Sequence, residues 1–363
     1  MRSSKHQKLS RLFDNFGPPI VLNCEQEKYV VFSDQHIGMP EFDHNKRLYL
    51  KALESFYGSG HKLIIAGDYE ELHRYGIKKL KQKYSEVYAL ERKFLERGRY
   101  FRLFGNHDID WKKRWRVKKS LDDVMPGLNI VEALKFSWKG NDIFLVHGHQ
   151  GEFFNDTLGI VGRIILRFLA RPLRISSLTS PAKRYIIRRK DEREYYSWAK
   201  NRKVLLIAGH THRPVFESLT KADRIRINID HMLRKYVREK DPDQAKRIRG
   251  EIAKQKADFE RIRKEEGEES RWTALGESDL VTPCYCNDGS CLHENGITCI
   301  EFCQNKIRLL LLYDAKMGAN VSKHLRAPTM DLLPDDPKAA GYKIQILEEE
   351  ELEYVFTKIQ LLS

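Results

Sequence analysis

The chain has 363 residues, of which 41% are hydrophobic, and a formal net charge of +14. This length and apolar content can form a substantial core, which excludes a disordered chain and favours one large or two modest domains. The 65 Lys and Arg residues outnumber the 51 Asp and Glu residues, which favours anionic partners such as phosphates, nucleic acid or a lipid surface.

The N-terminal segment 1–16 is basic, and no apolar stretch of the kind found in secretory signals follows it. We therefore expect a cytoplasmic protein. No apolar run approaches the roughly 20 residues of a membrane-spanning helix, and the longest candidate, 158–170, contains two arginines. The expectation is a soluble protein that is at most peripheral at the membrane.

Six cysteines in a predicted cytoplasmic chain indicate reduced thiols rather than disulfides. Five of them lie in the segment Cys284–Cys303, which also contains His293. Their spacing contains no CxxC pair, so ordinary thiols are preferred and a structural zinc site is the alternative.

Five short apolar runs each end at Gly or a polar residue, as buried strands do. They are residues 28–34, 62–68, 100–106, 143–149 and 204–210. Segments of helical character, 44–58 and 77–98, separate the first three runs. Alternating strands and helices predict an α/β fold with largely parallel strands.

In such sheets, functional residues gather at the carboxyl ends of the strands. The ends of the five runs carry Asp34, His36, Asp68, Asn106, His107, His147, His149, His210 and His212. Ordinary loop residues are the alternative for any one of them. Because five runs share the pattern, we expect one convergent site.

Carboxylates, an amide oxygen and several imidazoles suit borderline divalent ions such as Mn, Fe, Zn or Ni. Asp34 and His36 lie two residues apart, as do His210 and His212. Side chains two apart on an extended segment point the same way. With one carboxylate shared, the residues suffice for two metal ions about 3.5–4 Å apart, the spacing used in phosphoryl chemistry.

The motifs "DQH" at 34–36, "GDYEE" at 67–71, "GNHD" at 105–108, "HGH" at 147–149 and "GHTH" at 209–212 follow in this order. The chain in this respect resembles the calcineurin-like metallophosphoesterase superfamily. The resemblance implies a four-layer α/β/β/α sandwich with two mixed β-sheets and helical insertions. It places the segments 128–138, 143–149, 296–302 and 306–313 in the second sheet.

The resemblance also implies roles for the motif residues. One divalent ion would be held by Asp34, His36 and His212, and the other by Asn106, His147 and His210, with Asp68 bridging the two. Manganese is the expected metal, with Fe, Zn or Ni as alternatives.

A metal-bound hydroxide would attack phosphorus, while His107 protonates the leaving oxygen or steadies the phosphoryl group. Asp108 would orient the His107 imidazole. His149 would either support the ligands from behind or face the substrate, and with Arg213 it is an expected substrate-binding residue. An arginine in this position is as readily explained as solvated.

The expected domain covers 1–325, with a C-terminal extension at 326–363. A helical cap is predicted at about 152–202, suited to a substrate with an apolar tail and an anionic head or to an anionic membrane. A hairpin packed on the core is the alternative. The cap gives a distant similarity to the UDP-2,3-diacylglucosamine hydrolases, which have Arg where this chain has His107.

Two other segments could serve recognition. A charged helical hairpin at about 227–272, turning at "DPDQ", is either a solvated face or a surface for a homodimer or another partner. Segment 110–119 contains Trp111 and Trp115 among Lys and Arg, which could stack a base or grip a polyphosphate. Inward packing of both tryptophans is the alternative.

The sequence thus predicts a dinuclear metal-dependent phosphoesterase that hydrolyses a phosphomonoester, phosphodiester or pyrophosphate. The alternatives are a nuclease, although no dedicated nucleic-acid motif is visible, and a non-catalytic scaffold of the same fold.

Overall fold

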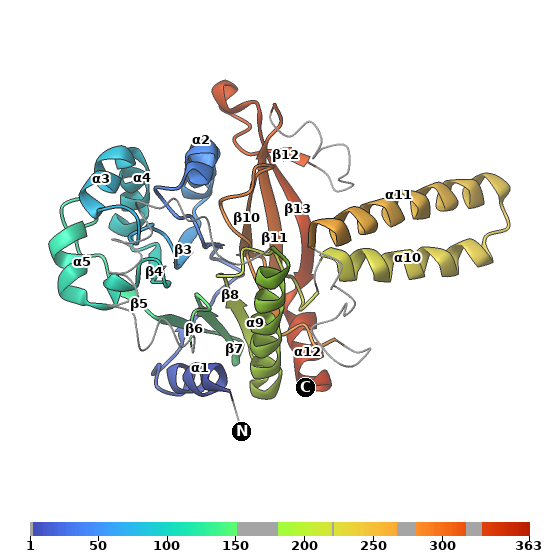
Figure 1. Ribbon diagram of the computed structural model, residues 1–363, viewed down its shortest axis with the longest axis horizontal. Helices are drawn as coiled ribbons and strands as arrows, with labels where there is room; N and C mark the ends of the chain where they lie inside the picture. Colours follow the sequence, from blue (N-terminus) through green and yellow to red (C-terminus); the bar gives the residue numbers. More distant parts are fainter. Residues whose placement is uncertain (1–2, 151–180, 220, 267–280, 317–328) are drawn as a thin grey trace.

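The computed structural model describes residues 3–150, 181–219, 221–266, 281–316 and 329–363. Residues 151–180, which include most of the predicted cap, lie outside the described residues. Two β-sheets lie between layers of helices, which confirms the four-layer sandwich (Figure 1).

The larger sheet has eight strands. In spatial order they are β12 (Thr329–Asp331), β13 (Tyr342–Glu351), β11 (Lys306–Asp314), β10 (Ile297–Cys303), β2 (Tyr29–Phe32), β3 (Lys62–Ala66), β4 (Tyr100–Leu103) and β5 (Ile130–Val131). The strands β2 to β5 are parallel, and β10 joins them antiparallel to β2, with Ile300 opposite Val31. The sheet is therefore mixed, as expected.

The second sheet has five strands. They are β1 (Ile20–Val21), β6 (Ala133–Trp138), β7 (Asn141–Val146), β8 (Leu205–Ala208) and β9 (Tyr285–Cys286). Strands β7, β8 and β9 are parallel, and β6 pairs antiparallel with β7.

Side-chain alternation along β2 and β3 separates two apolar layers. Val31 and Ile64 pack toward the second sheet, with Phe144 and Leu206. Their neighbours along the strands belong to a second cluster, with the apolar residues of helices on the other face of the large sheet. Burial of both faces explains why these strands are continuously apolar.

Helices cover both outer faces. The large sheet is covered by α2 (Pro40–Gly58), α3 (Ile77–Lys83), α4 (Ser85–Glu96), the 3-10 helix η1 (Ile109–Lys112) and α5 (Arg114–Leu121). The second sheet is covered by α1 (Ser4–Asp14), α9 (Pro181–Arg202) and α12 (Leu352–Leu362). A short 3-10 helix, η4 (Pro337–Ala339), precedes β13.

The C-terminal half of α9 buries Tyr195 and Trp198 in the core, so this half packs on the domain body rather than standing above it.

The strands β10 and β11 correct the assignment made from the sequence. They belong to the eight-stranded sheet, not to the second sheet. All seven residues of β10 are buried, so its apolar pattern fits either sheet equally well. The segment 128–138 is also divided, because β5 pairs with β4 and β6 lies in the second sheet.

The predicted C-terminal extension folds with the rest of the chain. The strand β13 pairs with β11 along its whole length, and Phe356 of α12 stacks on Trp138, with ring centroids 5.7 Å apart. The apolar residues of α12 recur at helical spacing and face the core. The predicted extension therefore contributes a strand to the eight-stranded sheet and a helix to the core.

Two long helices project from this body. They are α10 (Lys221–Arg238) and α11 (Pro242–Glu266), which pack against each other as a hairpin that extends beyond β13 (Figure 1). No helix among the described residues is both long and apolar enough to span a bilayer.

All six cysteines are buried free thiols. Within the described parts of the chain, the groups of side chains that could hold a metal contain no cysteine, so the structure gives no support to the zinc alternative.

Candidate metal centre

The predicted ligands lie where the central strands end. Hydrogen bonds continue the β2–β3 pairing into the loops, from the N–H of Asp34 to the carbonyl of Gly67 (3.1 Å) and from the N–H of His36 to the carbonyl of Asp68 (2.9 Å). The first two motifs therefore run side by side, which places their side chains at the same sheet edge.

Five of these residues have left-handed backbone conformations, which side chains other than glycine rarely adopt. They are Asp34 (φ 54°), His36 (45°), Asp68 (51°), His210 (69°) and His212 (57°). Each such residue costs on the order of 1–3 kcal/mol and persists only where its surroundings enforce it. This concentration of strain at one edge is typical of a functional site.

Glycines allow the loops to approach this closely. A Cβ on Gly105 would lie 2.1 Å from Asp68 Oδ1, and one on Gly209 would lie 2.6 Å from Asp34 Oδ2. The motif glycines are therefore required because the carboxylates occupy the space of a side chain.

One group of potential ligands brings together Asp34, His36 and His212. Asp34 Oδ1 lies 3.1 Å from His212 Nε2 and 3.7 Å from His36 Nε2, and the two imidazole nitrogens are 3.3 Å apart. The other carboxylate oxygen of Asp34 accepts hydrogen bonds from Ser33 Oγ (2.5 Å) and the His210 N–H (2.9 Å). These bonds fix the carboxylate and leave Oδ1 directed at the two imidazoles.

A second group contains Asp68, His147 and His210. Asp68 Oδ2 lies 3.2 Å from His147 Nε2 and 3.7 Å from His36 Nε2, so this carboxylate lies between the two groups. His147 Nδ1 is 3.0 Å from the carbonyl of Ala66. A proton on Nδ1 donates to that carbonyl, which leaves the Nε2 lone pair free for a metal.

Buried polar atoms test whether these residues fit metal ions. Asp34 Oδ1, Asn106 Oδ1 and His147 Nε2 are buried and form no hydrogen bond of good geometry with the described residues. Buried polar atoms without partners are rare in folded proteins. Because carboxylate, amide and imidazole donors converge here, a pair of divalent cations fits the site.

The pKa values of the site reflect the same crowding of negative charge. Burial would lower the pKa of His36, but Asp34, Glu71 and Asp68 raise it to about 10. Burial likewise opposes the pKa rise of His147 to about 9, which the charges of Asp68 and Asp34 cause. Burial would raise the pKa of Asp34 and Asp68, yet neighbouring imidazoles hold both well below the usual value. The carboxylates are thus ionised and attract cations.

Glu71 was not among the predicted site residues, although it closes the motif "GDYEE". Its Oε2 lies 3.0 Å from Nδ1 of His36 and 2.8 Å from Nδ1 of His107. Burial would raise the pKa of Glu71, but the two imidazoles lower it to about 2. The anionic carboxylate therefore hydrogen-bonds the His36 ring and attracts the His107 ring electrostatically, because His107 Nδ1 forms no hydrogen bond of good geometry.

His107 lies beside the candidate metal ligands but remains open to solvent. Its ring contacts the His36 ring edge-on, with centroids 4.6 Å apart, and its side chain is 31% exposed. Its Nε2 is 4.0 Å from Asp68 Oδ2. His73, also absent from the prediction, places its ring 4.9 Å from that of His107.

Asp108 does not occupy the predicted position beside the His107 imidazole. Its carboxylate accepts hydrogen bonds from the N–H of Gly105 (2.6 Å) and of Tyr69 (3.1 Å), and so joins the second and third motif loops. Burial, opposed by the nearby Arg102, raises the pKa of Asp108 to about 6. Adjacent residues on a tight loop point in different directions, which is why Glu71, not Asp108, reaches the His107 ring.

Behind these loops, Arg102 and Glu70 form a fully buried ion pair. Glu70 also accepts hydrogen bonds from Trp111 Nε1 and Tyr88 Oη, each at 2.8 Å. Glu70 is therefore held by neighbours on β4, α4 and η1, close to the loop that carries Asp68, whereas Nε and Nη1 of Arg102 are buried without a hydrogen bond to the described residues.

The two predicted substrate-binding residues differ in position. His149 is buried, and its ring lies 5.6 Å from that of His147 and 5.9 Å from that of Phe104. Burial and the neighbouring imidazoles lower its pKa well below the usual value, so it is neutral. Arg213 instead pairs with the buried Glu192, at 3.3 Å, which gives it a structural contact beside the site.

The two tryptophans of segment 110–119 differ in their exposure to solvent. Trp111 is buried, as the alternative interpretation expected. Trp115 is 59% exposed, and the guanidinium of Arg116 lies 5.4 Å from its ring centroid.

Comparisons with known proteins identify the family. Among curated proteins, none matches the chain by sequence. One similar solved structure is a conserved uncharacterized protein of Streptococcus pneumoniae TIGR4, described as a predicted phosphoesterase. It is 12% identical, the match covers 78% of this chain and 89% of that one, and the TM-score is 0.28. The model of the calcineurin-like phosphoesterases matches residues 27–214, which is just over half of the chain and includes all five motifs. The chain therefore belongs to the calcineurin-like phosphoesterase family.

Proposed function

We propose that the protein is a dinuclear metal-dependent hydrolase of phosphate esters or pyrophosphates, with manganese as its working metal. The observation that carries the proposal is the position of Asp68. Its Oδ2 lies between the two ligand groups, 3.2 Å from His147 Nε2 and 3.7 Å from His36 Nε2. A carboxylate in this position is suited to bridge two ions.

Each of the two ions would be held by the residues that the motifs assign to it. Asp34, His36 and His212 would hold one, His147, His210 and Asn106 the other, and Asp68 both. When bound, two such ions stabilise the charge on a transferring phosphoryl group and supply a nucleophile from water at neutral pH. Every predicted ligand position is occupied by a suitable donor, which speaks against the scaffold alternative.

In this proposal, His107 would handle the proton of the leaving group. Its Nδ1 lies 2.8 Å from Glu71 Oε2, a charge contact without good hydrogen-bond geometry, so Nε2 is the nitrogen open to a substrate. Partial exposure allows that substrate to reach the ring. Protonation of the leaving oxygen by a positioned imidazole typically contributes about 10²–10⁴-fold to the rate.

Nucleic acid is a second candidate substrate, and the exposed Trp115 favours it. Stacking on an exposed aromatic ring among basic residues is how sequence-tolerant proteins hold single strands. Trp115 is only eight residues from His107 in the chain. If nucleic acid is the substrate, Trp115→Ala weakens binding of a single-stranded oligonucleotide without changing cleavage of a small phosphodiester.

The test of the proposal is hydrolysis of a chromogenic phosphodiester and the matching monoester by purified protein with added Mn. Asp68→Asn is the inactivating variant, and Asp335→Asn, at an exposed position, is the matched control. We expect cleavage that Asp335→Asn retains and Asp68→Asn loses. Equal residual activity in both variants would contradict the proposal. The ratio of diester to monoester cleavage then selects the substrate class.

A further inference from the structure

The exposed apolar side chains of this protein concentrate on one helix. Among the described residues, nine large hydrophobic side chains are exposed, and four of them lie on α10. These four are Ile227, Leu233, Tyr236 and Val237, the last of which is 82% exposed. Scattered exposed apolar residues are normal, but several on one projecting helix mark an interaction surface.

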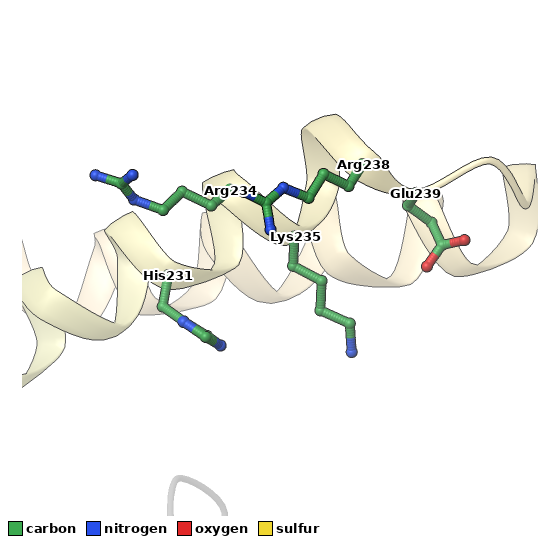
Figure 2. A pocket seen from close by; sticks show the side chains of 5 residues that line it. All are labelled: His231, Arg234, Lys235, Arg238 and Glu239. Atoms are coloured by element: carbon green, nitrogen blue, oxygen red, sulfur yellow. The ribbon is translucent and has the colours of Figure 1, made fainter.

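Basic side chains flank this apolar surface. His231, Arg234, Lys235 and Arg238 line a shallow hollow of about 300 Å³, together with Glu239 (Figure 2). Lys235 and Arg238 form no ion pair with any described residue, and Arg234 has only an exposed pair with Asp230 at 2.9 Å. Exposed pairs of this kind contribute little. The basic groups are therefore available to an anion.

Helical spacing arranges the two kinds of side chain in adjacent rows. Leu233 and Val237 are four residues apart and share one row, and Arg234 and Arg238 form the next row around the helix. With 18 residues, α10 is about 27 Å long. An apolar row beside a basic row on an exposed helix is the pattern of helices that lie in the plane of a membrane surface.

We propose that α10 docks the protein on an anionic phospholipid surface. Leu233 and Val237 would enter the boundary between headgroups and acyl chains, while the basic residues contact lipid phosphates. The hairpin projects from the body, so the sheets do not block this approach (Figure 1). The inference does not depend on the proposed hydrolase function, because it concerns binding alone.

Two other occupants explain the surface less well. Nucleic acid would pair with the basic row but gives no reason for exposed Leu233 and Val237. A second copy of α10 would cover the apolar row but would bring arginines and lysines of the same sign together. An anionic lipid surface satisfies both rows at once.

The test is sedimentation of the full-length protein with vesicles of phosphatidylcholine alone and with vesicles containing about one third phosphatidylglycerol. We expect binding to the anionic vesicles that weakens as salt is raised, and at least tenfold weaker binding to the neutral ones. Equal binding to both kinds of vesicle, or binding to neither, would overturn the proposal.

Matched variants assign that binding to α10. The triple change Arg234→Ala, Lys235→Ala and Arg238→Ala should weaken it about a hundredfold, at roughly fivefold for each basic residue near an anionic surface. Leu233→Ser with Val237→Ser should weaken it at least tenfold. The control, Lys246→Ala with Lys254→Ala and Lys256→Ala, removes the same charge from α11, whose described residues expose no large apolar side chain.

The control should change vesicle binding less than threefold. If it weakens binding as much as the α10 triple variant does, only total charge matters and the docking surface is wrong. If Leu233→Ser with Val237→Ser leaves vesicle binding intact but splits a dimer in light scattering, the occupant is a second copy instead. Thermal unfolding of every variant checks that the body remains folded.

Discussion

Glu71 Oε2 lies 2.8 Å from Nδ1 of His107, so a buried carboxylate lies against the imidazole that faces the solvent. The same oxygen holds His36, a predicted metal ligand, at 3.0 Å. Ligand orientation and proton handling therefore depend on one side chain.

Glu71→Gln should lower kcat about 10–100-fold with little change in KM, the usual cost of losing a partner that orients a ligand. Glutamine keeps the size but loses the charge that holds both rings. Steady-state kinetics on the phosphodiester measure the effect, with the exposed Glu96→Gln as control. A variant with unchanged kcat would show that Glu71 does not position either imidazole.

His107→Ala should retain bound metal and lower kcat about 10²–10⁴-fold. His107 also falls in a third group of potential ligands, with His36 and Glu71, but we assign the two ions to the groups centred on Asp34 and Asp68, so metal content by atomic absorption should stay at the wild-type value. The loss should be largest for a poor leaving group such as phenol and smaller for nitrophenol, which needs less protonation. A metal-free variant, or an equal loss for both substrates, would contradict the assigned role.

Asp108→Ala should destabilise the fold by about 2–4 kcal/mol, because it leaves two buried backbone N–H groups without an acceptor. Asp108→Asn keeps one acceptor oxygen and should cost less. Urea unfolding of the two variants measures the difference. If both variants unfold like the wild type and only turnover falls, the carboxylate acts in the reaction and not as a link between the loops.

Glu301 provides a pH-dependent contribution to stability far from the metal centre. Burial would raise its pKa, but hydrogen bonds from His61 (2.8 Å) and Arg308 (2.8 Å) lower it. A carboxyl group whose pKa is lowered by folding stabilises the protein above its unfolded pKa, near 4.3, and this contribution is lost as the pH falls through the folded value.

The stability difference between wild type and Glu301→Gln should therefore be largest near pH 7, at about 1–3 kcal/mol, and should shrink below about pH 4. Urea unfolding of both proteins at a series of pH values measures this difference and cancels the titration of other groups. A difference that is constant with pH would mean that the pKa of Glu301 does not shift on folding.

The sequence was sufficient to predict which candidate ligands converge at the sheet edge, because their positions depend on short-range features. Asp34 and Asp68 each follow directly after a buried strand, so their side chains lie at the sheet edge. Parallel strands share this edge. The left-handed conformations of these residues were not predictable, because they arise from close contacts between loops that are distant in the sequence.

Features that depend on contacts between distant parts of the sequence were predicted less well. The strand β10 is buried on both faces, so its composition could not decide between the two sheets. Asp108 is next to His107 in the sequence and Glu71 closes a different motif, and only the geometry of the loops decides which carboxylate reaches the His107 ring. That geometry depends on the backbone bonds of Gly105 and Tyr69, which the spacing of the motifs does not reveal.

The most direct test of the central claim is a titration of metal-depleted protein with Mn²⁺, followed by calorimetry and electron paramagnetic resonance. The account predicts two ions per chain with a spin-coupled spectrum, and loss of that coupling in Asp68→Asn, because this carboxylate lies between the two ligand groups. A single uncoupled ion in the wild-type protein, or coupling that survives in Asp68→Asn, would contradict it.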